Sequence, residues 1–89
     1  MSEIKVYNYT ENKFMRLDAK DLLKALEGNS SSEWVYDWGS GKERHFDCKD
    51  LKKAVEGTNP EDMVMEIGVG YIRINSEELR ENLNTLKGK

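Results

Sequence analysis

The sequence predicts an α+β protein in which three tandem strand-turn-strand-helix (ββα) repeats form a mostly antiparallel sheet with helices on one face. The first observation behind this prediction is an internal repeat. Residues 14–28 and 43–57 share Asp, Lys, Asp, Leu, Lys, Ala, Glu and Gly at matched positions, and residues 71–83 keep the pattern more loosely. The second observation is that each copy passes from strand-like alternation to helical spacing. We expect a single domain, 1–89, built from repeats 1–28, 29–57 and 58–86.

Two short strands are expected ahead of each helix. Alternating apolar and polar residues, broken by polar or glycine-rich turns, predict hairpins. The clearest turns are Gly39-Ser40-Gly41 and Gly68-Val69-Gly70. The expected strands cover residues 4–9, 14–17, 33–38, 42–46, 62–67 and 71–74. The connections 29–32 and 58–61 are short and polar, so the three units should pack as one body.

Each expected helix follows a residue that can cap it. Asp18, Asp47 and Asn75 can accept hydrogen bonds from the free N–H groups of a first helical turn. An acidic residue stands three positions later in each copy, as in a capping box. The predicted helices cover residues 19–27, 48–56 and 76–86.

The interior of each helix carries apolar residues at helical spacing. Leu22, Leu51 and Leu79 occupy equivalent positions and are expected to be buried. Gly28 and Gly57 follow the first two helices, where a left-handed glycine commonly ends a helix.

The alternation also assigns one face of each strand to the core. The residues expected to face inward are Ile4, Val6, Met15, Leu17, Trp34, Tyr36, Trp38, Phe46, Met63, Met65, Ile67, Ile72 and Ile74. Those expected to face outward are Lys5, Tyr7, Tyr9, Phe14, Arg16, Val35, Asp37, Glu43, His45, Val64, Glu66, Tyr71 and Arg73. Arg44 falls on the inward face, so we expect it at a sheet edge or with its guanidinium reaching solvent.

Trp34, Tyr36 and Trp38 alternate and so share one face, which has two interpretations. They could form an exposed ridge, because Trp and Tyr dominate the energetics of protein interfaces. They could instead be the bulky centre of the core, since each ring buries roughly 150–250 Å². The core interpretation is favoured, although Trp38 stands beside the glycine turn, where a ring is often only half covered.

Composition limits the classes of function. The chain has 89 residues, of which 14 are basic and 17 acidic, with one His and one Cys. One Cys excludes an internal disulfide framework, and one Cys with one His cannot form a tetrahedral zinc site within one chain. No apolar run exceeds three residues, so we expect neither a membrane span nor a signal peptide. We expect a cytoplasmic protein with no metal, no cofactor and no membrane contact.

No residue pattern predicts catalysis. Cys48 is expected at the first position of the second helix, three residues after His45. A Cys–His nucleophile pair needs hydrogen-bond contact and an orienting third group. The other copies have Ala19 and Ser76 in the place of Cys48, which indicates a small residue that merely fits. We therefore expect no enzyme and no catalytic residue.

The outer sheet face is the expected working surface. Arg16, His45 and Arg73 occupy the same repeat position on three return strands, with aromatic residues beside them. Aromatic and arginine side chains supply most of the affinity at protein interfaces, whereas lysines, abundant on the expected helices, are depleted there. The candidate partner-binding residues are Tyr7, Tyr9, Phe14, Arg16, Trp38, His45, Tyr71 and Arg73.

Two functions fit such a surface. The leading interpretation is a small soluble protein-binding module, a regulator or inhibitor that occupies a partner protein's surface. Compact proteins of this type are frequent among phage and mobile-element regulators, including inhibitors of host defence, and we expect that origin. The alternative is a nucleic-acid-binding domain, because basic side chains among aromatic rings also bind single strands. The net charge of −3 and the acidic residues on the same face favour a protein partner.

Overall fold

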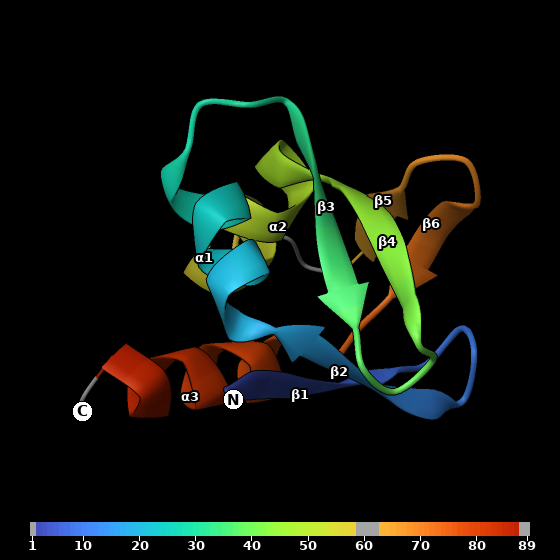
Figure 1. Ribbon diagram of the computed structural model, residues 1–89, viewed down its shortest axis with the longest axis horizontal. Coiled ribbons are helices and arrows are strands. Elements are labelled where there is room, and N and C mark those ends of the chain that lie inside the picture. Colours follow the sequence, from blue (N-terminus) through green and yellow to red (C-terminus); the bar gives the residue numbers. More distant parts are fainter. Residues whose placement is uncertain (1, 59–62, 88–89) are drawn as a thin grey trace.

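The computed structural model describes residues 2–58 and 63–87, so residues 59–61 of the expected second connection and Asp62 of the expected fifth strand lie outside it (Figure 1). The α+β class is confirmed, with six antiparallel strands and three helices in the described part. In chain order the elements are β1 (Glu3–Asn8), β2 (Lys13–Asp18), α1 (Ala19–Glu27), β3 (Ser32–Asp37), β4 (Lys42–Asp47), α2 (Cys48–Glu56), β5 (Met63–Glu66), β6 (Gly70–Arg73) and α3 (Ser76–Lys87).

The six strands form one sheet in the order β1-β2-β3-β4-β5-β6. The strands pair along their whole length only within hairpin 1 (β1–β2), hairpin 2 (β3–β4) and hairpin 3 (β5–β6). Neighbouring hairpins share one residue pair each, Leu17 with Asp37 and Phe46 with Glu66. A bridge between Asn8 and Ile74 brings the two outer strands together at one end. The sheet therefore curls until its first and last hairpins touch.

The three contacts between hairpins use the same backbone hydrogen bond. The N–H of Trp38 donates to the carbonyl of Arg16 at 2.8 Å, and the N–H of Ile67 donates to that of His45 at 2.6 Å. Hairpin 3 meets hairpin 1 in the same way, through a 2.8 Å bond from Tyr9 N–H to the Arg73 carbonyl. The contact between the ends of the sheet thus resembles the two contacts inside it.

The predicted helix starts are confirmed by their caps. The Asp18 side chain accepts from the N–H of Asp21 at 3.1 Å, and that of Asp47 accepts from Asp50 at 3.0 Å. Asn75 does the same for α3 at 3.1 Å. Each cap satisfies one of the N–H groups that a first helical turn leaves without a partner.

The helix ends differ in part from the prediction. Gly57 ends α2 in the left-handed region, at φ 77°, as expected. Gly28 ends α1 with an extended backbone at φ −85°, so the expectation of a left-handed cap there is wrong. Its N–H still closes the last turn by donating to the Lys24 carbonyl at 3.0 Å, which an extended residue can do.

The acidic residue in the first turn of each helix also holds the next hairpin. Asp21 accepts from the backbone N–H of Tyr36 at 3.1 Å, and Asp50 accepts from that of Met65 at 2.9 Å. Glu78 on α3 accepts from the N–H of Tyr7 on β1 at 2.8 Å. These carboxylates satisfy strand N–H groups at edges where the hairpins diverge.

One hydrophobic core lies between the inner face of the sheet and the helices. Leu22, Leu51 and Leu79 are fully buried, which confirms their predicted helical phase. The core residues are Ile4, Val6, Met15, Leu17, Ala19, Leu22, Ala25, Val35, Phe46, Cys48, Leu51, Ala54, Val64, Ile72, Ile74, Leu79 and Leu83.

Arg44 lies inside the molecule, so its expected place at a sheet edge or in solvent is wrong. Its side chain is fully buried and bonds to a carboxylate from each hairpin. Nε donates to Asp37 at 2.9 Å, Nη1 to Glu66 at 2.9 Å and Nη2 to Glu11, in the hairpin 1 turn, at 2.7 Å. A buried guanidinium is tolerated because its charge is compensated and its N–H groups have acceptors.

The expected orientation of β3 and β5 is wrong. Asp37 and Glu66 point inward to Arg44, and this determines which face of β3 and of β5 is buried. A shift of the strand by one residue would turn every side chain to the opposite face. Six residues expected inside lie instead on the outer side of these strands or just beyond them: Trp34, Tyr36, Trp38, Met63, Met65 and Ile67. Four residues expected outside are buried instead: Val35, Asp37, Val64 and Glu66.

Candidate functional site

Nearly all of the aromatic residues lie on the outer side of the sheet. The chain has eight Phe, Trp and Tyr residues, and only Phe46 belongs to the core. Tyr7 and Tyr36 are half-buried on the outer side. The exposed aromatic residues are Tyr9, Phe14, Trp34, Trp38 and Tyr71. We call Tyr7, Tyr9, Phe14, Trp34, Tyr36 and Trp38, on or next to β1, β2 and β3, the aromatic face.

The first part of the aromatic face lies on hairpin 1. The ring of Tyr7 meets Tyr9 and Phe14 edge to face, with ring centroids 5.1 and 4.9 Å apart. The ammonium group of Lys5 lies 4.2 Å from the centre of the Phe14 ring. Edge-to-face pairs and a cation over a ring are favourable geometries that hold these side chains in place.

Arg16 and Trp38 connect hairpin 1 to hairpin 2. Arg16 donates to the carbonyl of Trp38 at 3.2 Å and to the Glu3 carboxylate at 3.4 Å. The indole N–H of Trp38 donates to the cap residue Asp18 at 3.3 Å. Its ring meets Tyr36 edge to face at 4.6 Å. The surface is therefore continuous from β1 across β2 to β3.

Trp34 and His45 form the far end of the surface. Their rings stack at 4.3 Å with an angle of 11° between the planes. The His45 ring also contacts the Ser32 hydroxyl, with Nε2 and Oγ 2.9 Å apart. Trp34 is 56% exposed and so presents one broad apolar surface to solvent.

The structure brings together five of the eight candidate residues from the sequence, Tyr7, Tyr9, Phe14, Arg16 and Trp38. The other three are also on the outer side. His45 stacks on Trp34, while Tyr71 and Arg73 lie on β6, which adjoins β1 near Tyr9.

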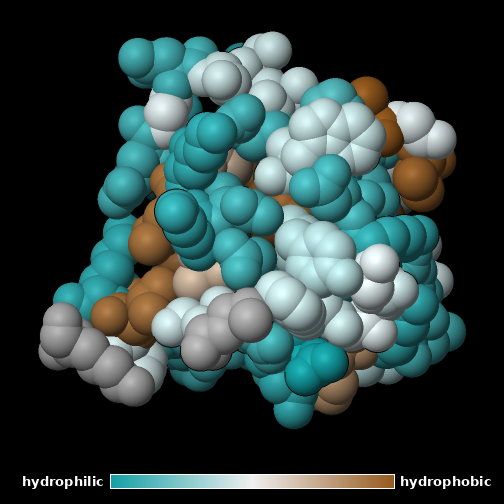
Figure 2. All heavy atoms as spheres, in the orientation of Figure 1, coloured by the Kyte–Doolittle hydropathy of each residue, from teal (hydrophilic) through white to brown (hydrophobic). Residues whose placement is uncertain are grey.

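Sequence reasoning missed Trp34 and Tyr36 by placing them in the core. The signal that could have found them is the repeat itself, because Val6, Val35 and Val64 are each 29 residues apart. Aligning these valines on one inward position turns Trp34 and Tyr36 outward. In Figure 2, large pale rings lie over β3 and the strand beside it, with hydrophilic side chains around them.

The electrostatics of the Arg44 network indicate a structural role. The hydrogen bond from Arg44 is the main reason why the pKa of Glu11 is lowered. Burial alone would raise the pKa of Asp37, but hydrogen bonds from Arg16 N–H and the Arg44 guanidinium outweigh it and leave the pKa lowered. Burial likewise opposes the charge of Arg44, yet hydrogen bonds to Glu11 and Asp37 raise its pKa overall. Arg44, Glu11 and Asp37 are therefore charged at neutral pH.

Cys48 is in a place that disfavours reactivity. It is fully buried, like Ala19 and Ser76 at the same position of α1 and α3. Burial, with the nearby charge of Glu33, raises the pKa of its thiol, so the thiolate is scarce at neutral pH. Among residues 2–58 and 63–87, no group of His, Cys, Asp and Glu is arranged to hold a metal ion. No helix in these segments has the length and apolar character needed to cross a membrane.

Comparison with protein families, with curated proteins and with solved structures finds no match to this chain. The candidate site therefore rests on its own geometry: a continuous aromatic face on the outer side of β1, β2 and β3, with Lys5, Arg16 and His45 among its rings.

Proposed function

We propose that the protein is a binding module, a regulator or inhibitor that covers part of a partner protein's surface with its aromatic face. The observation that carries this proposal is the distribution of rings, with seven of eight aromatic residues outside the core. Interfaces are enriched in Tyr, Trp, Phe and Arg, and these residues supply most of the binding energy.

The size of the aromatic face supports the proposal. Tyr9, Phe14, Trp34 and Trp38 are between 36% and 56% exposed. A ring of this kind covers roughly 150–250 Å², so the four offer on the order of 300–400 Å² to a partner. Apolar patches of about this size are often functional in monomeric proteins.

The arrangement of the rings favours a protein partner over a nucleic acid. Bases bind to open ring faces. One face of Phe14 is covered by Lys5, and one face of Trp34 is covered by His45, which leaves only the opposite face of Trp34 toward solvent. The other rings meet edge to face. Arg16, the arginine between hairpins 1 and 2, pairs with Glu3 and a backbone carbonyl. Apolar side chains of a partner can pack on such rings without needing a free face.

We also infer that the three ββα units are copies of one unit, which carry the aromatic face on one side of the sheet and the helices on the other. The repeated caps, the repeated carboxylate contacts to strand N–H groups and the repeated bonds between hairpins support this inference. Aromatic residues are unevenly spread over the copies: hairpins 1 and 2 carry six outer rings and hairpin 3 carries Tyr71.

The test is capture of partners from the source cells with the tagged full chain, followed by mass spectrometry. The captured partner is then titrated against three proteins: the wild type, a Phe14→Ala/Trp34→Ala variant, and a Lys24→Ala/Lys53→Ala control on the helices. We expect the aromatic variant to lose more than about tenfold in affinity and the control to stay near wild type. The same loss in the helix control, with the aromatic variant silent, would overturn the proposal. Capture that nuclease treatment abolishes would favour the nucleic-acid alternative.

A further inference from the structure

The turns of the three hairpins are held in different ways. In hairpin 1, the Thr10 hydroxyl accepts from the backbone N–H of Arg73 at 2.9 Å. In hairpin 2, the Ser40 hydroxyl donates to the Asp37 carboxylate at 2.8 Å. The hairpin 3 turn, residues 67–69, consists of apolar residues and glycine, so none of its side chains can bond back to the protein in this way. Its hydrogen bonds come from the backbone alone.

The side chains at this third turn are exposed. Ile67 is 40% exposed, Val69 is 67% exposed, and Tyr71, two residues further along the chain, is 56% exposed. Gly68 and Gly70 turn the chain at φ 89° and 128°, and a Cβ atom added at either would meet no other atom within 4 Å. We call Ile67, Val69 and Tyr71 the apolar tip. Apolar residues gathered at one exposed place, rather than scattered, are typical of interaction sites.

A free positive charge lies beside the apolar tip. Arg73 follows Tyr71 by two residues on β6, so the two side chains are on the same side of the sheet. At the matching position of hairpin 1, Arg16 pairs with the Glu3 carboxylate. The guanidinium of Arg73 has no hydrogen bond or ion pair with any residue that the structure describes. Its charge is therefore available to a carboxylate of another molecule.

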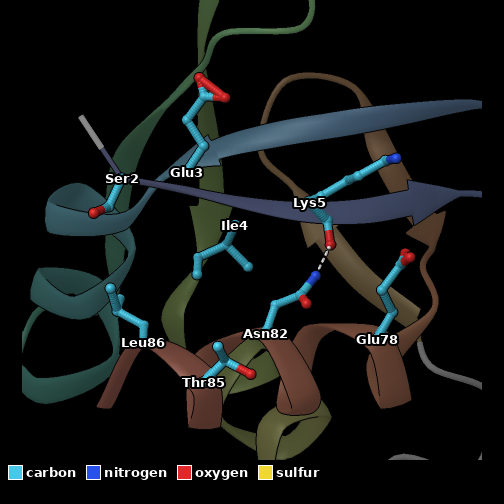
Figure 3. Close-up of a pocket in the computed structure, with 8 residues that line it drawn as sticks. All are labelled: Ser2, Glu3, Ile4, Lys5, Glu78, Asn82, Thr85 and Leu86. Atoms are coloured by element: carbon cyan, nitrogen blue, oxygen red, sulfur yellow. Dashed lines mark hydrogen bonds between the residues drawn. The ribbon is translucent and has the colours of Figure 1, made fainter. Parts of the chain in front are cut away.

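A depression of the surface lies between β1 and α3 and has a volume of about 480 Å³. Figure 3 shows Ile4 and Leu86 pointing toward this space, beside the hydrogen bond from Asn82 to the Lys5 carbonyl. A second depression, of about 450 Å³, shares Leu86 with the first and adds Leu23 to the apolar wall. A water molecule takes roughly 30 Å³, so this space can receive whole side chains.

The charge left in the two depressions is negative. The Glu78 carboxylate accepts from the neutral N–H of Tyr7 and so keeps its charge. Lys5 also lines the first depression, but Figure 3 shows its ammonium group turned away, and this group lies over the Phe14 ring. The other charged residues that line the two depressions are Glu3, Asp18 and Lys20. Three carboxylates thus line the space against two ammonium groups, and a cation is the complementary ligand group.

We propose that the protein associates with itself head to tail, with the apolar tip of one copy in the depression between β1 and α3 of a second copy. Val69 packs against Leu86, and Arg73 meets the Glu78 carboxylate, so apolar surfaces and opposite charges match across the contact. Figure 1 shows the turn between β5 and β6 and the C-terminal part of α3 on opposite sides of the molecule, so a chain cannot fill its own depression. The contact joins two unlike surfaces and can therefore repeat from copy to copy.

This association does not depend on the aromatic face and so stands apart from the proposed function. Sedimentation equilibrium of the full chain at increasing concentration tests it. One hairpin turn in one depression forms a contact smaller than about 1,200 Å², and interfaces of that size are weak. We therefore expect the average mass to rise above that of the monomer at high micromolar to millimolar concentration. A mass that stays that of the monomer up to millimolar concentration overturns the proposal.

Two variants separate the two surfaces. Ile67→Ser/Val69→Ser removes the apolar tip, and Thr85→Arg places a cation at an exposed position of α3 that lines the depression. Each variant alone should remain monomeric. An equal mixture should form dimers, because one variant keeps the depression and the other keeps the tip. Lys49→Ser is the control on α2, which forms part of neither surface, and it should associate like the wild type.

The charge contact is tested separately. Arg73→Gln should weaken association several-fold, and so should Glu78→Gln, which keeps an acceptor for the Tyr7 N–H. If the double serine variant fails to fold in a thermal melt, Val69→Glu replaces it. Association that survives loss of the tip, or a mixture of the two surface variants that stays monomeric, overturns the head-to-tail contact. Association insensitive to both glutamine variants overturns the pairing of Arg73 with Glu78.

Discussion

The guanidinium of Arg44 lies 2.9 Å from the carboxylate of Asp37, and both side chains are buried. Through Glu66 and Glu11 the same guanidinium also bonds to hairpins 3 and 1, so one side chain connects all three hairpins. Hairpin 1 has an uncharged version of this arrangement. Asn8 and Met15 stand 29 residues before Asp37 and Arg44, and the Asn8 amide donates to the Met15 sulfur at 3.7 Å.

Arg44→Met should lower the free energy of unfolding by about 3–5 kcal/mol, because it leaves Asp37 and Glu66 buried without their counter-ion. Urea denaturation measures this change. Adding Asp37→Asn and Glu66→Gln removes the uncompensated charges and should recover a large part of the loss. A triple variant as unstable as Arg44→Met would show that shape, rather than charge, determines this position.

Stability should fall in acid and should do so through the same network. The pKa values of Glu11 and Asp37 are lowered in the folded protein, so their contribution is fully present above the unfolded pKa of about 4. It is lost as the pH falls through the folded values, since protonation then breaks the bonds to Arg44. Urea midpoints measured between pH 7 and pH 2.5 test this. A Glu11→Gln variant, which keeps an acceptor without a titrating group, should show a smaller decrease.

Removing the cap of α2 should destabilise the protein measurably. Asp47→Ala removes the acceptor for the Asp50 N–H and should cost about 0.5–2 kcal/mol in the free energy of unfolding. Asp47→Ser keeps an acceptor and should lie close to wild type. Equal losses for both variants would point to the charge of Asp47, not to the cap bond.

Truncating neighbouring residues on β3 should destabilise the protein to different extents. Val35→Ala removes two buried methyl groups and should cost about 1.5 kcal/mol or more. Trp34→Ala removes a larger but exposed side chain and should cost less than about 1 kcal/mol. Thermal and urea melts of the two variants decide the orientation of the strand. The reverse order would mean that the tryptophan faces the core.

The sequence was sufficient to predict the α+β class, the helix starts at Asp18, Asp47 and Asn75, and the faces of hairpin 1. It was sufficient because local signals determine these features. Caps act within one helical turn, and the alternation on β1 is unambiguous because the apolar Ile4 and Val6 flank the charged Lys5. On β3 the alternation puts Trp34 and Tyr36 on one face and Val35 and Asp37 on the other, and the sequence analysis favours burying the face with the rings. Which face is buried depends on Arg44, because its charge needs Asp37 beside it. Alternation within one strand cannot reveal that pairing.

The candidate site was predictable only in part for the same reason. Residues of hairpin 1 were placed on the correct face, so Tyr7, Tyr9, Phe14 and Arg16 were available as candidates. The sequence analysis places Trp34 in the core because it assigns the wrong face of β3 to the interior. The contact between Arg16 and Trp38 crosses from one hairpin to the next, and such contacts follow from the pairing of strands rather than from any local pattern.

The bond between Glu78 and Tyr7 spans 71 residues, while its two counterparts, Asp21 with Tyr36 and Asp50 with Met65, each span 15. The entropy of loop closure makes the long contact costlier by roughly 1 kcal/mol, although the three bonds are alike in geometry. Local opening should therefore begin where α3 holds β1. In hydrogen exchange, the Tyr7 amide should lose its proton sooner than the amides of Tyr36 and Met65. The order in which the chain connects its three similar units thus makes one of three equivalent contacts the weakest.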